Sequence, residues 1–165
     1  LDDTVITTAA NWAALAVVTC GETAVIVHCD PGANIKQTLI NLDTGAVSAS
    51  TNVVVGTIEA LDAHPYTTTH YALAYTDPAT PNQVTVARVT AATSTVAATA
   101  NLATTGAAAR PAIAALEGVG FALACWDLGV TGVVSWRLTT VFGTAWGPTG
   151  RAGSPRWAAS CGAAS

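Results

Sequence analysis

The sequence predicts an all-β fold of three four-stranded antiparallel repeats. An apolar segment that ends in Asp occurs three times, at residues 24–30, 71–77 and 121–127, so the Asp residues are 47 and 50 positions apart. A further segment rich in Val and Leu ends 12, 12 and 11 positions after the respective Asp. A recurrence every ~40–50 residues is typical of repeat architectures, in which each repeat is one small group of strands.

Composition supports strands rather than helices. Hydrophobic residues make up 51% of the 165 positions and charged residues only 10%, a balance that favours folding over disorder. The β-branched residues Val, Ile and Thr are frequent in the apolar segments, and they suit the pleated surface of a sheet. No apolar run approaches the roughly 18 residues of a membrane-spanning helix, so we expect no membrane insertion.

The strands of each repeat can be placed in order. The first begins at an Ala-Leu pair (residues 14–15, 60–61 and 115–116), and the second is the segment that ends in Asp. The third covers residues 37–42, 84–89 and 133–138, and the fourth covers residues 46–51 and 95–101 in the first two repeats. We expect strand rather than helix across the Ala-rich residues 91–109, because Thr and Val are frequent there.

The chain is predicted to be a single repeat domain over residues 1–165. The repeats span approximately residues 12–56, 57–106 and 107–155, with partial repeats at both ends. Residues 4–11 resemble a fourth strand, and residues 157–160 resemble residues 12–15 at the start of the first repeat.

Four-stranded meanders at this period are typical of β-propeller blades. A blade buries both of its faces, and the second repeat has large and small residues in alternation, namely Tyr71, Leu73 and Tyr75 against Ala72, Ala74 and Thr76. Closed propellers have about 4–8 blades, so three repeats imply a longer array or the assembly of several chains. A β-trefoil is the alternative fold, although the Gln-x-Trp pattern typical of trefoils is missing.

The four cysteines leave two interpretations open. Cys20, Cys29, Cys125 and Cys161 allow three disulfide connectivities, but Cys29 and Cys125 lie in apolar segments where a thiol packs as a small hydrophobic group. Because no Cys-x-x-Cys occurs, a zinc ribbon is not favoured, and we expect no metal and no cofactor.

Three recurring carboxylates are candidates for a turn or for a cation site. Asp30, Asp77 and Asp127 each end the second strand of a repeat, so they would lie at equivalent positions. Asp before Pro or Gly commonly bonds its own backbone two residues on, which favours the turn. The recurring Arg88 and Arg137 are expected to pair with these carboxylates across the hairpin.

Tryptophans gather in the last third of the chain. Trp126, Trp136 and Trp146 are candidates for ligand binding, because aromatic rings stack on sugars; the alternative is that they fill interfaces between sheets or subunits.

No catalytic residue stands out. His28, His64 and His70 are scattered, no Gly-x-Ser-x-Gly motif occurs, and Glu22, Glu59 and Glu117 form no obvious pair for glycoside hydrolysis. The net charge of −4 with only six Lys and Arg residues argues against nucleic-acid binding. We therefore expect a protein that is not an enzyme.

The repeat pattern resembles a family of phage tail-fibre and other virion proteins. In the second repeat the matching residues are Ala60-Leu61, the segment 71–77 and Val86-Ala87-Arg88-Val89; in the third, Ala115-Leu116, the segment 121–127 and Trp136-Arg137-Leu138. The first repeat departs from the pattern, with Asn41 in place of the Arg. The resemblance implies a β-propeller-like structural or receptor-binding module in a virion or outside the cell. Its partners would be further copies, other virion proteins, or a glycan or protein of the host surface. A secreted carbohydrate-binding, lectin-like protein is the alternative function.

Overall fold

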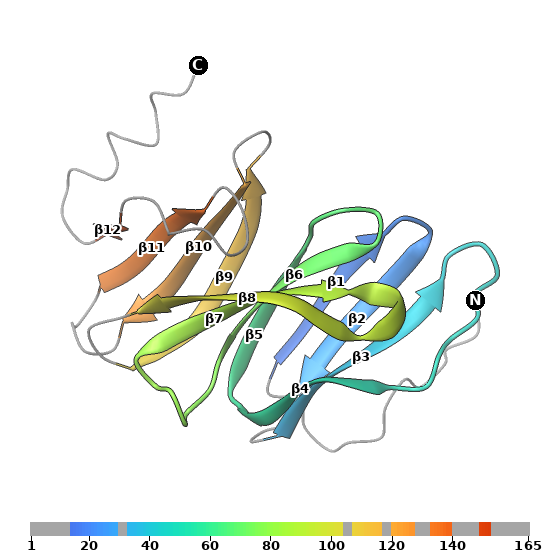
Figure 1. The fold of residues 1–165 in the computed structure, drawn as a ribbon, viewed down its shortest axis with the longest axis horizontal. Coiled ribbons are helices and arrows are strands. Elements are labelled where there is room, and N and C mark those ends of the chain that lie inside the picture. The colour runs from blue at the N-terminus through green and yellow to red at the C-terminus, as the bar shows by residue number, and fades with distance from the viewer. Residues whose placement is uncertain are drawn as a thin grey trace.

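The computed structural model shows an all-β chain of three four-stranded antiparallel sheets (Figure 1). It describes residues 14–29, 33–103, 107–116, 120–127, 133–139 and 149–152. Within these residues the only helical element is one 3₁₀ turn, η1 (Ala91–Thr93). The predicted fold class is thus confirmed at the level of an all-β chain of four-stranded antiparallel sheets.

In each sheet the strands lie in chain order, so every sheet is a meander. The first sheet contains β1 (Ala14–Cys20), β2 (Thr23–Cys29), β3 (Ala33–Asn41) and β4 (Thr51–Ile58). The second contains β5 (Ala60–Pro65), β6 (His70–Thr76), β7 (Gln83–Thr90) and β8 (Thr95–Ala103). The third contains β9 (Ala108–Leu116), β10 (Gly120–Asp127), β11 (Val133–Thr139) and β12 (Thr149–Ala152). Strand was expected across residues 91–109, and β8 and the start of β9 are present there, but Ala91–Thr93 form the 3₁₀ turn η1 instead, and residues 104–106 lie outside the described residues.

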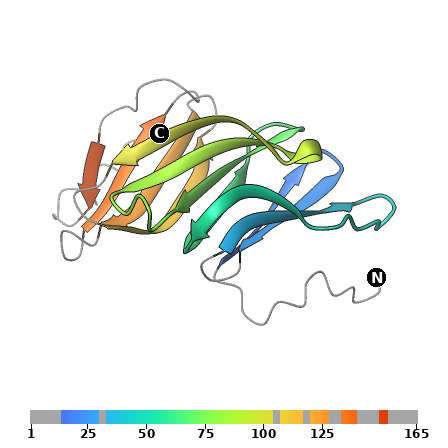
Figure 2. The same ribbon diagram turned by 60° about the horizontal axis from the view of Figure 1, so that its bottom comes forward.

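The three apolar segments that precede an Asp form β2, β6 and β10, which are the second strands of their sheets. The sheets follow one another across the molecule, with β5–β8 between the other two (Figures 1 and 2). Their first strands lie together, because β5 contacts both β1 and β9. The stack is open, since the strongly contacting pairs of strands include none between the first and third sheets.

The second sheet is buried on both faces, as the alternation of its residues predicts. Tyr71 and Leu73 of β6, both 0% exposed, pack against the first sheet, whereas Ala72 and Ala74 of the same strand pack against the third. Successive residues of a strand point to opposite faces, so one strand supplies both cores.

Each core consists mainly of β-branched and small residues. The core between the first and second sheets includes Val18, Cys20, Val25, Val27, Cys29, Ile35, Ile58, Leu61, Tyr71, Leu73, Ala87, Val89 and Ala91. The core between the second and third includes Ala72, Ala74, Val84, Val86, Leu102, Ala108, Ile113, Leu123 and Cys125. Cys20 is a buried free thiol, so of the two interpretations of the cysteines, packing as a small hydrophobic group is correct for Cys20. Cys29 and Cys125 are buried as well. Cys161 lies outside the described residues.

A buried polar link joins the first two sheets. The Tyr71 hydroxyl donates a hydrogen bond to Gln37 Oε1 over 2.7 Å, and Gln37 Nε2 donates to the carbonyl oxygen of Ala91 over 2.5 Å. Gln37 is 0% exposed, so an unpaired amide there would be costly. Burial raises the pKa of Tyr71 far above its ordinary value of 10.0, and the nearby Cys20 adds to the rise.

The fourth strand of the first sheet begins later than predicted. Residues 46–51 were expected to form it, but β4 starts at Thr51, and only Val47 forms an isolated bridge, to Ile40. Side-chain hydrogen bonds explain the delay: Ser48 Oγ accepts from the Leu39 amide, and Ser50 Oγ bonds Thr38 Oγ1. Such bonds compete with a regular strand ladder.

The Ala-Leu pair of the third repeat was aligned incorrectly. Leu15 and Leu61 pair with His28 and Tyr75, near the end of the second strand of their sheets, but Leu116 pairs with Gly120 at its start. The chain around β9 is so rich in Ala that an alignment can slide along it without disturbing the apolar pattern.

Replacing Tyr71 by Phe tests the buried link. We expect Tyr71→Phe to lower the free energy of unfolding by about 1–3 kcal/mol, because Gln37 Oε1 loses its donor in the core. In the native protein, stability should also fall as the pH rises above the ordinary tyrosine pKa of 10.0, since the unfolded chain releases the proton that the buried phenol keeps. The variant should show less of this alkaline loss. Denaturant titrations of both proteins across alkaline pH would measure the two effects.

Gln37→Ala and the double variant provide the control. If the two side chains act through one bond, the double variant loses less stability than the sum of the single variants. Strict additivity would contradict the link.

Candidate functional site

The connections that leave one end of the first two sheets meet in a single surface. The β1–β2 turn contacts the β5–β6 loop, since a Cβ atom at Gly21 would lie 3.2 Å from the Thr68 carbonyl oxygen. The Thr51 and Ser94 hydroxyls are 2.6 Å apart, which joins the start of β4 to the β7–β8 turn. We call this surface the hydroxyl-rich end; its exposed side chains include Thr44, Ser48, Ser50, Thr51, Thr67, Thr68, Thr69 and Thr93.

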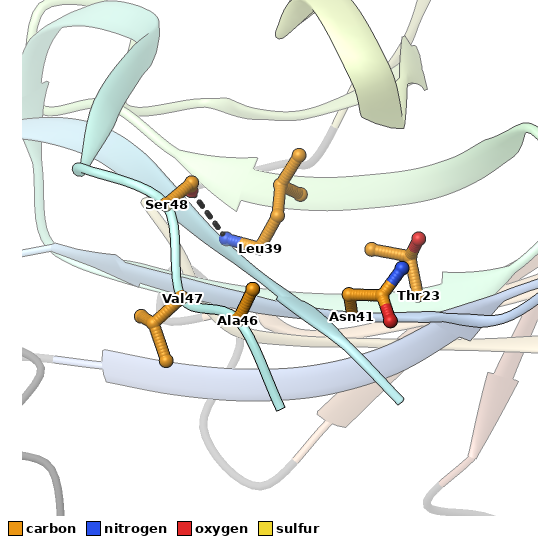
Figure 3. Close-up of a pocket in the computed structure, with 6 residues that line it drawn as sticks. All are labelled: Thr23, Leu39, Asn41, Ala46, Val47 and Ser48. Atoms are coloured by element: carbon orange, nitrogen blue, oxygen red, sulfur yellow. Dashed lines mark hydrogen bonds between the residues drawn. The ribbon is translucent and has the colours of Figure 1, made fainter. Parts of the chain in front are cut away.

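A groove lies at this end, beside the last residues of β3 (Figure 3). Its volume is about 320 Å³, near the lower limit of the roughly 300–1,000 Å³ usual for small-ligand pockets. The β3 groove is lined by Thr23, Leu39, Asn41, Ala46, Val47 and Ser48. In the close-up Thr23 and Asn41 lie together at one end, and Leu39 and Ser48 at the other. It thus combines aliphatic surface with hydroxyl and amide groups.

Hydrogen bonds hold the walls of the β3 groove. The Leu39 amide donates to Ser48 Oγ over 2.9 Å, and the Ser48 amide donates to the Leu39 carbonyl oxygen over 2.9 Å. The backbone N–H of Asn41 similarly donates to the carbonyl oxygen of Ala46. The segment 46–48 therefore runs beside β3 as a fixed wall rather than as a free loop.

Asn41 also fixes the turn at the rim. Its side-chain oxygen accepts hydrogen bonds from the backbone amides of Asp43 and Thr44, at 3.1 and 2.8 Å, and from the Thr44 hydroxyl at 2.9 Å. Gly45 follows with a φ of +72°, a conformation that favours glycine. The sequence identified Asn41 only as a departure from the repeat pattern, although Asn-Leu-Asp-Thr-Gly is a recognisable sign of such a turn.

The loop between β5 and β6 presents a second group of polar side chains. His70 Nδ1 lies 2.8 Å from the Thr69 hydroxyl and 3.3 Å from the Thr67 hydroxyl. The Thr67 hydroxyl also accepts from the amides of Thr69 and His70. These contacts hold the hydroxyl and imidazole groups of the loop in fixed positions.

The candidate tryptophans lie in the third sheet, away from the β3 groove. Trp126 is in β10 and Trp136 in β11, and the register pairs them with Val134 and Ala124. Trp146 lies outside the described residues. Their role in ligand binding stays a prediction.

Asp77 closes a turn. Its Oδ1 accepts a hydrogen bond from the Ala79 amide over 2.8 Å, and its carbonyl oxygen accepts from Thr80. Its other carboxylate oxygen lies beside Gly56 of β4, where an added Cβ would be only 3.3 Å away. Asp127 is the last residue of β10, and Asp30 lies outside the described residues. In the described part of the chain, no three His, Cys, Asp or Glu side chains gather in a way that could hold a metal ion.

Nearby Tyr75 responds to the same environment. Burial raises its pKa, a hydrogen bond with Thr85 lowers it, and the Asp77 carboxylate adds a smaller rise.

The expected pairing of Arg88 with Asp77 is wrong. Arg88 lies opposite Ala72, five residues before Asp77, so the two side chains start roughly 16 Å apart along the hairpin. Arg88 belongs to the face of β7 that carries Val84 and Val86, and its Nε is buried without a hydrogen-bond partner. The number of residues between the Asp and the Arg is nearly the same in the second and third repeats. This spacing places the two residues far apart along the hairpin and not opposite each other.

A different carboxylate joins two sheets. Asp62 of β5 accepts a hydrogen bond from the Ile113 amide of β9 over 2.9 Å, and its other oxygen accepts from Ala63. Sequence analysis missed this residue, because it occurs in only one of the sheets and carries no periodic signal.

No protein-family model, curated protein or solved structure matches the chain. None of the helical segments in the described ranges has the length and apolar character needed to cross a membrane.

Substitutions of Asp77 distinguish a turn from a cation site. Asp77→Asn keeps an oxygen that can accept from Ala79, so we expect little change in thermal stability. Asp77→Ala removes the acceptor and should cost about 1 kcal/mol. Thermal unfolding with added calcium and with a chelator completes the measurement. A rise in the midpoint with calcium that Asp77→Asn abolishes would show that the carboxylate binds a cation instead.

Proposed function

We propose that this protein is a non-enzymatic binding module of a virion or of the extracellular space, in which propeller-like blades present the hydroxyl-rich end to a host surface. Phage tail or fibre components are the class that the sequence pattern resembles. The observation that carries the proposal is the β3 groove, which is lined by β2, β3 and the β3–β4 connection at the end where connections of the first two sheets meet.

The arrangement of the sheets supports propeller-like blades. Each sheet is a meander, the sheets stack face to face, and the first strands β1, β5 and β9 lie side by side. In a propeller such first strands would surround the axis. Three separate sheets with two separate cores favour this arrangement over a trefoil.

The chemistry of the hydroxyl-rich end favours a polar, uncharged ligand. The groove offers the Asn41 amide and the hydroxyls of Thr23 and Ser48 beside the aliphatic side chains of Leu39 and Val47. Sugars present hydroxyls together with apolar ring faces, so a glycan fits this combination. Binding groups in proteins commonly lie on connecting segments that a rigid set of strands or helices holds in place.

The alternative is a secreted lectin-like protein. The same groove supports it, because recognition of a free sugar needs no virion. The two functions differ in the partner: a virion module binds one host surface, whereas a lectin binds a soluble glycan wherever that glycan occurs.

Binding of the purified chain to a glycan array and to candidate host cells tests the proposal. We expect Ser48→Arg, which fills the groove, to weaken binding by about tenfold or more. Thr99→Arg is the matched control, since Thr99 is also exposed but lies on β8. Inhibition by a free sugar would favour the lectin. Equal binding by both variants, or binding of neither surface by the native chain, would contradict a site at the groove.

A further inference from the structure

Within the described residues, no sheet covers one apolar face of the first sheet. Leu15 and Val17 of β1 are 48% and 62% exposed, although Val18 and Cys20 of the same strand are buried in the core. Ile26 of β2 lies opposite Val17 and therefore on the same face. We call this the open face; Leu15 and Val17 are its exposed residues, Ile26 is half-buried, and His28, which lies opposite Leu15 on the same face, is buried.

The second sheet shows what such a face normally contacts. Leu61 pairs with Tyr75 as Leu15 pairs with His28, and Ala63 pairs with Leu73 as Val17 pairs with Ile26. Leu61 is only 8% exposed and Leu73 is 0% exposed, because the first sheet covers them. The open face is thus the topological equivalent of a face that a neighbouring sheet buries.

The covering face also has a consistent position. The first sheet covers the second with Val25 and Val27 of β2, and the second covers the third with Ala72 and Ala74 of β6. In the third sheet Leu123 of β10 belongs to the core shared with the second sheet. Ala112 and Ala114 of β9 alternate with Ile113, which belongs to the same core, so they lie on the opposite face of that sheet, and both are exposed. This is the free face of the third sheet.

We propose that the open face binds the free face of the third sheet of a second copy of this chain. The contact repeats the two sheet-to-sheet contacts within the chain. Because the contact joins two different surfaces, the open face of one copy and the free face of the next, each added copy leaves one of each surface unoccupied. Further copies can therefore add until the last one contacts the first and closes a ring. Two copies supply six sheets, which lies within the range of about 4–8 blades seen in closed propellers; three copies would supply nine. The protein is therefore a head-to-tail dimer with two identical contacts.

The solution mass of the native chain is the first measurement. Light scattering after size exclusion should give twice the 16.5 kDa of one chain. Val17→Lys places a charge in the contact and should raise the dissociation constant by about tenfold or more, which shifts the mass towards that of the monomer. Thr99→Lys is the matched control, because Thr99 is exposed on β8 of the second sheet and lies outside both faces of the proposed contact; this variant should remain a dimer.

A variant of the other surface tests the direction of the contact. Ala114→Lys should also dissociate the dimer if the free face of the third sheet is the partner surface. A dimer that persists in Ala114→Lys but not in Val17→Lys would show that the open face binds a second open face, which overturns the proposal. A native monomer or a trimer would overturn it as well.

Circular dichroism would show whether a variant fails to fold. In that case, amide hydrogen exchange on the native chain provides the test instead. Protection of β1 should then increase with protein concentration, and protection that is independent of concentration would refute the dimer. The number of copies rests on the propeller-like arrangement of the proposed function, but the contact does not depend on glycan binding, so loss of glycan binding with an intact dimer affects only the proposed binding role.

Discussion

The fold depends on the burial of both faces of the second sheet. Tyr71 and Leu73 fill the core towards the first sheet, while Ala72 and Ala74 allow the third sheet to approach closely on the other side. Because the residues alternate along one strand, a shift of the register by one position would exchange large and small residues between the two cores. Polar groups reinforce each contact: Gln37 bonds Tyr71 across the first interface, and Asp62 bonds the Ile113 amide across the second.

The same arrangement determines where binding groups lie. In a meander, alternate connections leave the sheet at the same end, so the stacking of two sheets brings four connections together without any long loop. Asn41 and Thr67 then fix these connections through side-chain bonds to the backbone. If the hydroxyl-rich end is the binding surface that we propose, this fixation of its connections reduces the entropy that would be lost on binding.

Much of the fold could be predicted from the sequence, because its main signals are periodic. The Asp-terminated segments marked β2, β6 and β10, and their alternation marked both cores. The start of β4 was misplaced because Ser48 and Ser50 bond the neighbouring strand through their side chains, which a strand pattern does not reveal. The Ala-Leu pair at residues 115–116 was misaligned because Ala recurs throughout β9. The candidate site was harder to predict, since the β3 groove and the Asp62 bond depend on contacts that occur once and between segments distant in sequence.

Amide hydrogen exchange of the native chain tests the central claim most directly, since protection reports how strongly each strand is held in the fold. If the second sheet is the centre of the stack, the amides of β6 and β7 should exchange most slowly and those of β4, an edge strand, much faster. Equal exchange of β6 and β4 would contradict the account, because it would mean that the second sheet is no better buried than an edge of the molecule.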